Sequence, residues 1–264
     1  MAEAAADRLV PLLRRDRLIC GALLAAVCAL AWVYTLAGAS IAPPLGGLAP
    51  APGESPGSAA MGWSLSHGAL MLAMWWVMMV AMMLPSAVPV ILLAAALNRR
   101  ATGRAPFSAT AVFVAGYLLA WLGFSLAAVV AQAALAEVRW IGSGMASASG
   151  VLSGGLLLAA GAWQFTPAKR ACLRHCRSPV DWLIRHRGRG WRGALAIGMG
   201  HGGYCLGCCW ALMALLFVGG VMNPLWIAGL ALLVLVEKLA PRGPALGRIT
   251  GLILLMSGGV VLLP

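Results

Sequence analysis

Long apolar segments alternate with short basic ones along most of the chain. A helix needs roughly 20 apolar residues to cross about 30 Å of hydrocarbon. By this measure the pattern predicts seven spans, at about 18–38, 66–97, 108–134, 147–166, 193–218, 224–239 and 248–263. We therefore expect an all-α fold, a polytopic transmembrane helical bundle, with six spans if the first is a cleaved signal sequence.

Composition agrees with a membrane environment. Of 264 residues, 62% are hydrophobic and 10% are charged, whereas about a quarter of the residues in a soluble domain are charged. The net charge of +12 is concentrated in short segments between the predicted spans. Basic residues in that position set topology and meet anionic lipid headgroups, so we expect the lipid bilayer as a partner and no nucleic acid.

The basic residues also orient the predicted bundle. Eighteen of the nineteen Lys and Arg residues fall on one side of the seven-span arrangement, and Arg139 is the exception. They occupy the N-terminal segment, 98–107, 167–192 and 238–248. The positive-inside rule makes this side cytoplasmic. We expect a multi-pass protein of the plasma (inner) membrane, with its N-terminus cytoplasmic and its C-terminus external.

Two parts of the chain differ in character. Residues 1–62 hold the basic N-terminal segment, the first span and a Pro/Gly-rich stretch, 40–62, that is typical of an outer loop. Residues 63–264 form the second part, a six-helix membrane domain rich in Met and Cys.

The second predicted span carries a methionine ladder. At about 100° per residue, one helical face within roughly 80° holds His67, Met71, Met74, Met78 and Met82. Met79 and Met83 form a neighbouring ridge. Thioether sulfur is a soft, neutral donor that suits Cu(I). The alternative is that these methionines fill gaps between packed helices.

The fifth predicted span places a histidine among cysteines. His201, Cys205 and Cys208 lie within about 60° on one helical face, and Cys209 lies roughly 40° beyond Cys205. One imidazole and two thiolates at this spacing can share a soft ion. The alternative is that these cysteines are small buried hydrophobes in a tightly packed, glycine-rich helix. An imidazole inside a membrane span nevertheless requires a partner.

A third group of metal-ligand residue types follows the fourth span on the predicted cytoplasmic side. Cys172, His175 and Cys176 are spaced so that they could exchange a soft ion there. Their arginine neighbours could equally lower thiol pKa values for redox work. Thiols stay reduced on the cytoplasmic side, so we expect no disulfide framework.

Three runs carry a resemblance to a known family: 74–86, 164–179 with its Cys-Leu-x-x-Cys-Arg-Ser-Pro motif, and 201–213 with Gly-Cys-Cys-Trp. They resemble a bacterial domain-of-unknown-function family described as predicted metal-binding integral membrane proteins. Glu237-Lys238 at the end of the sixth span also fits. The resemblance covers about 60–264. It implies metal binding but no particular reaction.

Together these patterns predict a membrane protein that binds Cu(I), or another soft transition metal, for transport or for delivery to a protein that uses it. We expect binding rather than catalysis, with a metal donor or acceptor protein as partner. One rival hypothesis is a membrane thiol oxidoreductase that uses Cys205 and Cys208. Another is a structural subunit whose Met and Cys residues only pack.

Overall fold

The computed structural model describes residues 2–46, 65–142, 145–185 and 190–263. In these ranges the chain is a helical bundle, which confirms the predicted fold class. The helices are α1 (Ala2–Gly46), α2 (Leu65–Thr102), α3 (Phe107–Glu137), α4 (Gly150–Phe165), α5 (Pro167–Arg177), α6 (Val180–Arg185), α7 (Gly190–Ala214), α8 (Leu216–Gly219), α9 (Pro224–Leu239) and α10 (Gly243–Leu262).

Each predicted span corresponds to helix, but the helices differ in length. Five stretches are long and apolar enough to cross a membrane: Pro11–Gly38, Leu65–Thr102, Phe107–Glu137, Gly190–Gly219 and Gly243–Leu262. Helices α4 and α9 have 16 residues each, which at 1.5 Å per residue is about 24 Å and less than the hydrocarbon thickness. The structure therefore supports a membrane protein with at least five candidate spans.

The predicted outer loop begins later than the sequence pattern indicated. Helix α1 continues to Gly46, so residues 40–46 are helical. Most residues that follow the first span, as far as Ala42, are small or apolar, with Ser40 the one polar residue, and this allows the helix to continue. The rest of the predicted loop, 47–62, lies outside the described residues.

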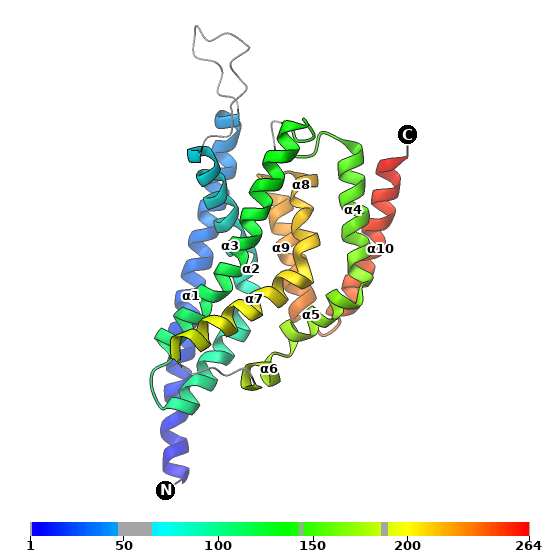
Figure 1. Cartoon of the computed structure of the whole chain (residues 1–264). Helices are drawn as coiled ribbons and strands as arrows, with labels where there is room; N and C mark the ends of the chain where they lie inside the picture. The colour runs from blue at the N-terminus through cyan, green and yellow to red at the C-terminus, as the bar shows by residue number, and fades with distance from the viewer. Residues whose placement is uncertain (1, 47–64, 143–144, 186–189, 264) are drawn as a thin grey trace.

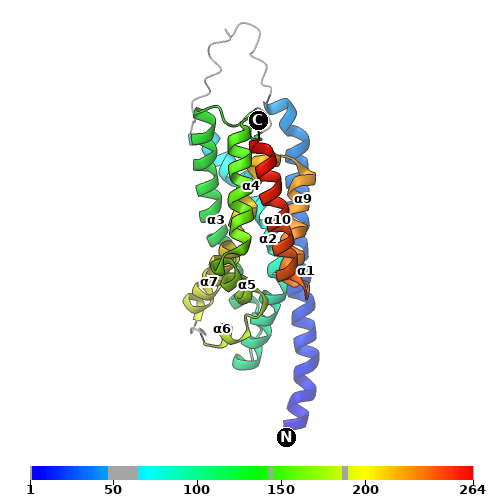
Figure 2. The same ribbon diagram turned by 90° about the vertical axis from the view of Figure 1, so that its right-hand side faces the viewer.

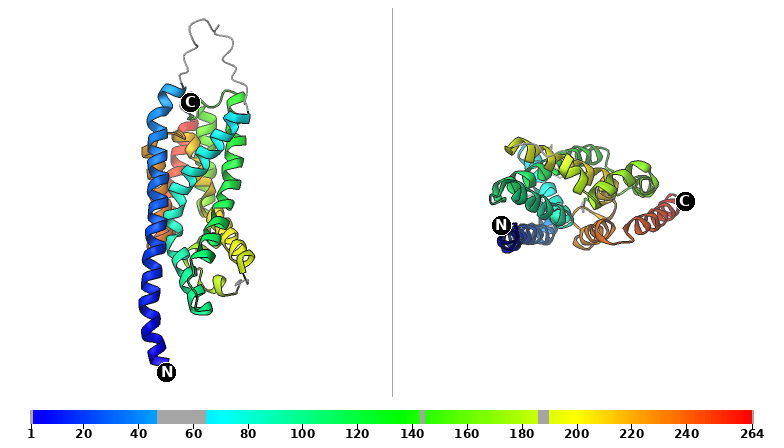
Figure 3. Two further views of the ribbon diagram at one scale, coloured as in Figure 1. Left: turned by 90° about the vertical axis from the view of Figure 1, so that its left-hand side faces the viewer. Right: turned by 90° about the horizontal axis from the view of Figure 1, so that it is seen from below.

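The bundle has two distinct ends. The N-terminus, the α2–α3 connection, α5 and α6 lie toward one end, and the C-terminus and the α3–α4 connection lie toward the other (Figure 1). Helices α4 and α10 run side by side (Figure 2). Seen along its axis, the bundle has α1 at one edge and α10 at the opposite edge (Figure 3). The predicted basic segments thus gather at one end of the molecule.

Helix α2 supplies much of the buried core between these edges. Trp75, Met79, Met83 and Leu84 are fully buried, together with Trp121 of α3. Helices α3 and α7 approach so closely that a Cβ atom at Gly198 would collide with the backbone of Phe113. Small residues permit such contact between membrane helices, and this accounts for part of the glycine content of α7.

Helices α5 and α9 begin in the same way. Thr166 accepts a hydrogen bond from the Lys169 amide at 3.2 Å, and Asn223 accepts one from the Trp226 amide at 3.2 Å. A proline follows each of these N-cap residues at the first helical turn, where its missing N–H costs nothing. Both helices start at fixed points, and both contribute to the site described below.

A buried ion pair joins α1 to α2 near the basic end. Arg99 Nε and Nη2 contact the two carboxylate oxygens of Asp16 at 2.5 and 2.8 Å. Both side chains are more than nine-tenths buried. A bidentate pair of this kind fixes the relative position of two helices as well as balancing their charge.

Candidate metal centre

The cysteines of α7 lie inside the bundle. Cys205, Cys208 and Cys209 are almost completely buried. The thiols of Cys208 and Cys209 both donate to the backbone oxygen of Cys205, at 3.1 and 3.0 Å. Bonds to a helix carbonyl are a common resting position for small polar side chains within membrane helices. Rotation about χ1 would free either sulfur for another partner.

Helix α5 brings two further thiols to α7. The Cys176 side chain hydrogen-bonds to Cys208. Cys172 packs on Gly207, where an added Cβ would lie 2.7 Å from the Cys172 sulfur. Only glycine at this position allows so close an approach. Burial raises the pKa of the Cys172 thiol, so a metal bound there would displace a proton.

A thioether from α2 and a phenol from α3 also lie against the cysteines of α7. Met83 Sδ of α2 lies 3.8 Å from Cys209 Sγ. The Tyr117 hydroxyl of α3 lies 3.1 Å from Cys205 Sγ and donates to the Met83 backbone oxygen at 3.1 Å. Helices α2, α3, α5 and α7 therefore converge on one group of soft donors, which we call the sulfur cluster: Cys172, Cys176, Cys205, Cys208, Cys209 and Met83.

A buried lysine balances this group. Lys238 Nζ of α9 contacts Cys205 Sγ at 2.9 Å and donates to Ser86 Oγ at 3.1 Å. The lysine side chain is only 5% exposed. An ammonium group in contact with sulfur favours the thiolate. Lys238 contributes to the positive-inside count, but its side chain faces the bundle interior instead of the aqueous side.

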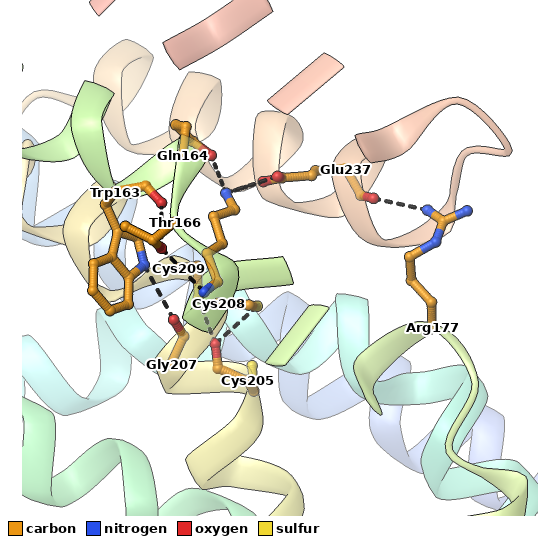
Figure 4. A network of polar contacts seen from close by, with 10 residues as sticks. Trp163, Gln164, Thr166, Arg177, Cys205, Gly207, Cys208, Cys209 and Glu237 are labelled. Carbon is orange, nitrogen blue, oxygen red and sulfur yellow. Dashed lines mark hydrogen bonds and ion pairs between the residues drawn. The ribbon is translucent and has the colours of Figure 1, made fainter. Parts of the chain in front are cut away.

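A second buried lysine lies one layer away. Lys169 of α5 pairs with Glu237 of α9 at 2.7 Å and also donates to Gln164 of α4. Figure 4 shows Gln164 and Glu237 directed at the same ammonium group, close to the cysteines of α7. A Cβ atom at Gly247 would collide with the Glu237 carboxylate, so this glycine provides room for the pair. Buried charges in a bundle are tolerated when they are paired in this way.

Arg177 fixes the end of α9 that carries Glu237 and Lys238. Its Nη1 donates to the backbone oxygens of Glu237, Lys238 and Ala240 at 2.9, 3.2 and 2.7 Å. The Glu237 and Lys238 carbonyls belong to the last turn of α9, whose carbonyls lack intrahelical donors. Ala240 follows the helix, and its carbonyl also accepts from Gly243 N at 3.0 Å. Figure 4 shows the contact between Arg177 and the Glu237 carbonyl. The run 164–179 thus supplies two thiols, one ammonium group and a helix cap.

A small cavity adjoins the Lys169–Glu237 pair. It has a volume of about 50 Å³ and is lined by Gln164, Lys169, Glu237, Arg248 and their neighbours. A polar space of this size can hold a few water molecules. The pair therefore borders a polar space in addition to the packed helices.

Two of the three predicted histidine ligands, His201 and His175, lie differently from the cysteines. His201 is buried, and its ring stacks on Phe113 and Tyr117 at centroid distances of 6.2 and 5.8 Å. His175 stacks on Tyr204 at 4.1 Å, and its Nδ1 contacts the backbone oxygen of Ala171 at 3.0 Å. Both rings lie beside the sulfur cluster and are held by aromatic contacts.

The methionine ladder runs along the interior of α2. Met74, Met78 and Met82 are buried, whereas His67 and Met71 at the far end are half-buried. The contact with the cysteines is made by Met83, on the neighbouring ridge. Burial of this kind agrees with either a packing role or a ligand role, because both require the sulfur atoms to face inward.

In the structure as it stands, the His, Cys, Asp and Glu side chains of the described residues are not arranged to coordinate a metal ion. Across the described ranges, no group of three or more His, Cys, Asp and Glu side chains is placed so that it could hold a metal ion. Two of the thiols are directed at a carbonyl and one is paired with Lys238. Metal binding at the sulfur cluster therefore requires side-chain rotation.

Several residues of the sulfur cluster environment were not predicted from the sequence as ligands or partners. Met83 was placed on a ridge beside the methionine ladder and not among the ligands, and Ser86 and Tyr117 had no assigned role. A signal existed for Lys238, because a lysine within a predicted span needs a partner. Its position at the end of the span allowed the simpler interpretation as a cytoplasmic charge.

Comparison with known proteins adds a function class to this geometry. A family model described as PpoB2, copper chaperone, matches residues 72–261. No curated protein and no solved structure matches the chain. The matched region contains the sulfur cluster, both buried lysines and all of the methionine ladder except His67 and Met71. The match agrees with the metal-related family that the sequence motifs resemble, and it names copper as the metal. The chain belongs to the PpoB2 copper chaperone family.

Proposed function

We propose that this protein binds Cu(I) inside the membrane bundle at the sulfur cluster and delivers it to an acceptor protein. The observation that carries the proposal is the convergence of five thiols and one thioether from three helices around Cys208 and Cys209. Soft sulfur donors select Cu(I) over hard cations such as Mg²⁺. Membership of a copper chaperone family supports the same cargo.

In the proposed site, Cys205, Cys208 and Cys209 supply the tighter donors and His201 lies within reach as a further ligand. Lys238 offsets the negative charge of the thiolates, so the loaded site carries little net charge. That matters because an unpaired charge inside a membrane bundle is costly.

The α5 residues suit a transfer role in the same proposal. Cys176 contacts Cys208, and Cys172 and Cys176 lie on the helix that follows the α4 span. A ligand exchange from Cys208 to Cys176 and Cys172 would move the ion toward the basic end of the bundle, with His175 beside the path. Met74, Met78 and Met82 would serve as transient donors toward the other end.

Metal content of the purified protein tests the proposal. Reduced protein should bind Cu(I) stoichiometrically, and Cys205→Ser with Cys208→Ser should remove most of it, because serine offers a hard oxygen of similar size. Cys20→Ser is the matched control, since Cys20 is buried in α1 away from the predicted site. Equal copper in the folded double variant and the wild type would refute the site.

The same experiment separates the two rivals. A thiol oxidoreductase would hold a reversible disulfide among these cysteines and little copper. A structural subunit would bind no copper, and Met78→Leu with Met82→Leu would change neither folding nor copper handling. The seven cysteines are free thiols in the structure.

We also propose that the basic end faces the cytoplasm of a plasma (inner) membrane, with the C-terminus external. The segregation of basic residues supports this orientation. A reporter fused after Arg177 should then read cytoplasmic, and one fused after Gly53 should read external. The reverse result at either position would overturn the orientation and the assigned direction of the α5 thiols.

A further inference from the structure

The end of the bundle opposite α5 holds a buried glutamine between two methionines. Gln132 of α3 is only 5% exposed. Its Nε2 lies 3.8 Å from Met71 Sδ and 3.5 Å from Met145 Sδ. Met71 belongs to α2, and Met145 lies in the α3–α4 connection, which Figure 1 places at the end away from α5 and α6.

The orientation of the Gln132 amide is fixed by a third residue. Trp75 Nε1 donates to Gln132 Oε1 at 2.7 Å. An indole N–H is a donor only, so the amide oxygen must face it and the NH₂ group must face the sulfurs. Thioether sulfur is a weak acceptor. Both protons of a buried amide are therefore directed at poor partners, which leaves this position under-satisfied.

The loop that carries Met145 is held in an unusual backbone conformation. Met145 has φ +52°, a left-handed region that bulky residues rarely adopt. Its amide donates to Gly142 O at 3.0 Å, and its carbonyl accepts from Val221 N at 3.4 Å. Ser147 N donates to Phe217 O at 2.7 Å. Strain that neighbouring contacts maintain in this way is often associated with function.

We infer that Met71 and Met145 form a second, thioether site for Cu(I) at this end of the bundle, distinct from the sulfur cluster. Both sulfur atoms lie against the Gln132 amide, and a soft cation would take the place of its protons when the glutamine side chain swings away and gives up its hydrogen bond with Trp75. His67 lies one helical turn before Met71 on the same face. It is the nearest predicted third donor.

The site deepens the proposed function, on which it rests, by giving the ion a point of entry or exit opposite α5. Neutral thioethers bind Cu(I) without adding charge, so the ion is held less firmly than by thiolates. A weaker site at the end and a stronger one inside would suit release to an acceptor protein or capture from a donor.

The rate at which an added oxidant converts each methionine to its sulfoxide, measured in the purified full chain with and without Ag(I), tests this site. Ag(I) serves as a redox-inert analogue of Cu(I). Bound Ag(I) should slow sulfoxide formation at Met71 and Met145 by about tenfold or more, because coordination occupies the sulfur lone pair that the oxidant attacks. Met222 provides an internal control, since it is also half-buried and lies in the α8–α9 turn. Its oxidation rate should not change.

Leucine variants complete the test because they nearly conserve volume. Met145→Leu should abolish the protection of Met71, and Met222→Leu should leave it intact. Oxidation of Met71 and Met145 at the same rate with and without Ag(I) would overturn the inference. If Met71 and Met145 are protected while Cys205→Ser with Cys208→Ser keeps its copper, the sulfur cluster proposal fails and this site stands. If Met71 and Met145 are not protected while Cys205→Ser with Cys208→Ser loses its copper, the thioether site is refuted and the sulfur cluster proposal stands.

Discussion

Replacing Lys169 with methionine should destabilise the protein by about 3–5 kcal/mol, because it leaves the Glu237 carboxylate buried without its partner. The pair is 2.7 Å apart, and both side chains are nearly fully buried. Methionine keeps the length of the lysine stem, so little packing is lost. Unfolding in detergent, followed by helical signal against denaturant or temperature, measures the change.

The control for this effect is the neighbouring Arg170, which is exposed. Arg170→Met removes the same charge and should change stability by no more than about 0.5 kcal/mol. Adding Glu237→Gln to Lys169→Met should recover much of the loss, since no unpaired charge then remains. If Lys169→Met and Arg170→Met have equal effects, the ion pair does not support the fold.

Replacing Lys238 with methionine should weaken Cu(I) binding by about 10–100-fold, the usual effect of removing a group that supports metal ligands. Lys238 Nζ contacts Cys205 Sγ at 2.9 Å. Without this cation a thiolate in the bundle has no counter-charge, so the thiol keeps its proton and binds copper poorly. Competition with a Cu(I) chelator measures the affinity.

Lys238→Met should change the free energy of unfolding less than it changes the free energy of Cu(I) binding. Cys205 can take up a proton when the ammonium group is lost, so no buried charge is left unpaired. Arg242→Met is the matched control, because Arg242 is exposed in the turn after α9. It should bind Cu(I) as the wild type does. Unchanged affinity in Lys238→Met would show that Lys238 does not support the sulfur cluster.

The helical bundle was predictable from the sequence because it follows from local rules. A run of apolar residues near the length of the hydrocarbon core must form a helix, since lipid offers no partner for free backbone groups. The spacing within one helix is equally local. Cys205 and Cys208 on α7, and Met74, Met78 and Met82 on α2, face inward together because 3.6 residues complete a turn.

The partners of these residues depended on how the helices pack. Nothing in the spacing of α5 indicated that Cys176 would reach Cys208, or that Gly207 would admit Cys172. Trp163 Nε1 at the end of α4 donates to Gly207 O of α7 at 3.2 Å, and Arg177 at the end of α5 caps α9. These contacts join residues more than 40 positions apart, and helical periodicity carries no information at that separation.

The sequence by itself determined that the chain forms apolar helices, five of them long enough to cross a membrane, and that sulfur lines the inner faces of two of them. The tertiary structure alone decided that Lys238 turns from the basic end toward Cys205, and that Met145 meets Met71 across Gln132. The physical reason is that burial of an isolated charge or amide is unfavourable until another helix supplies its partner. Which helix does so is settled only when the bundle packs.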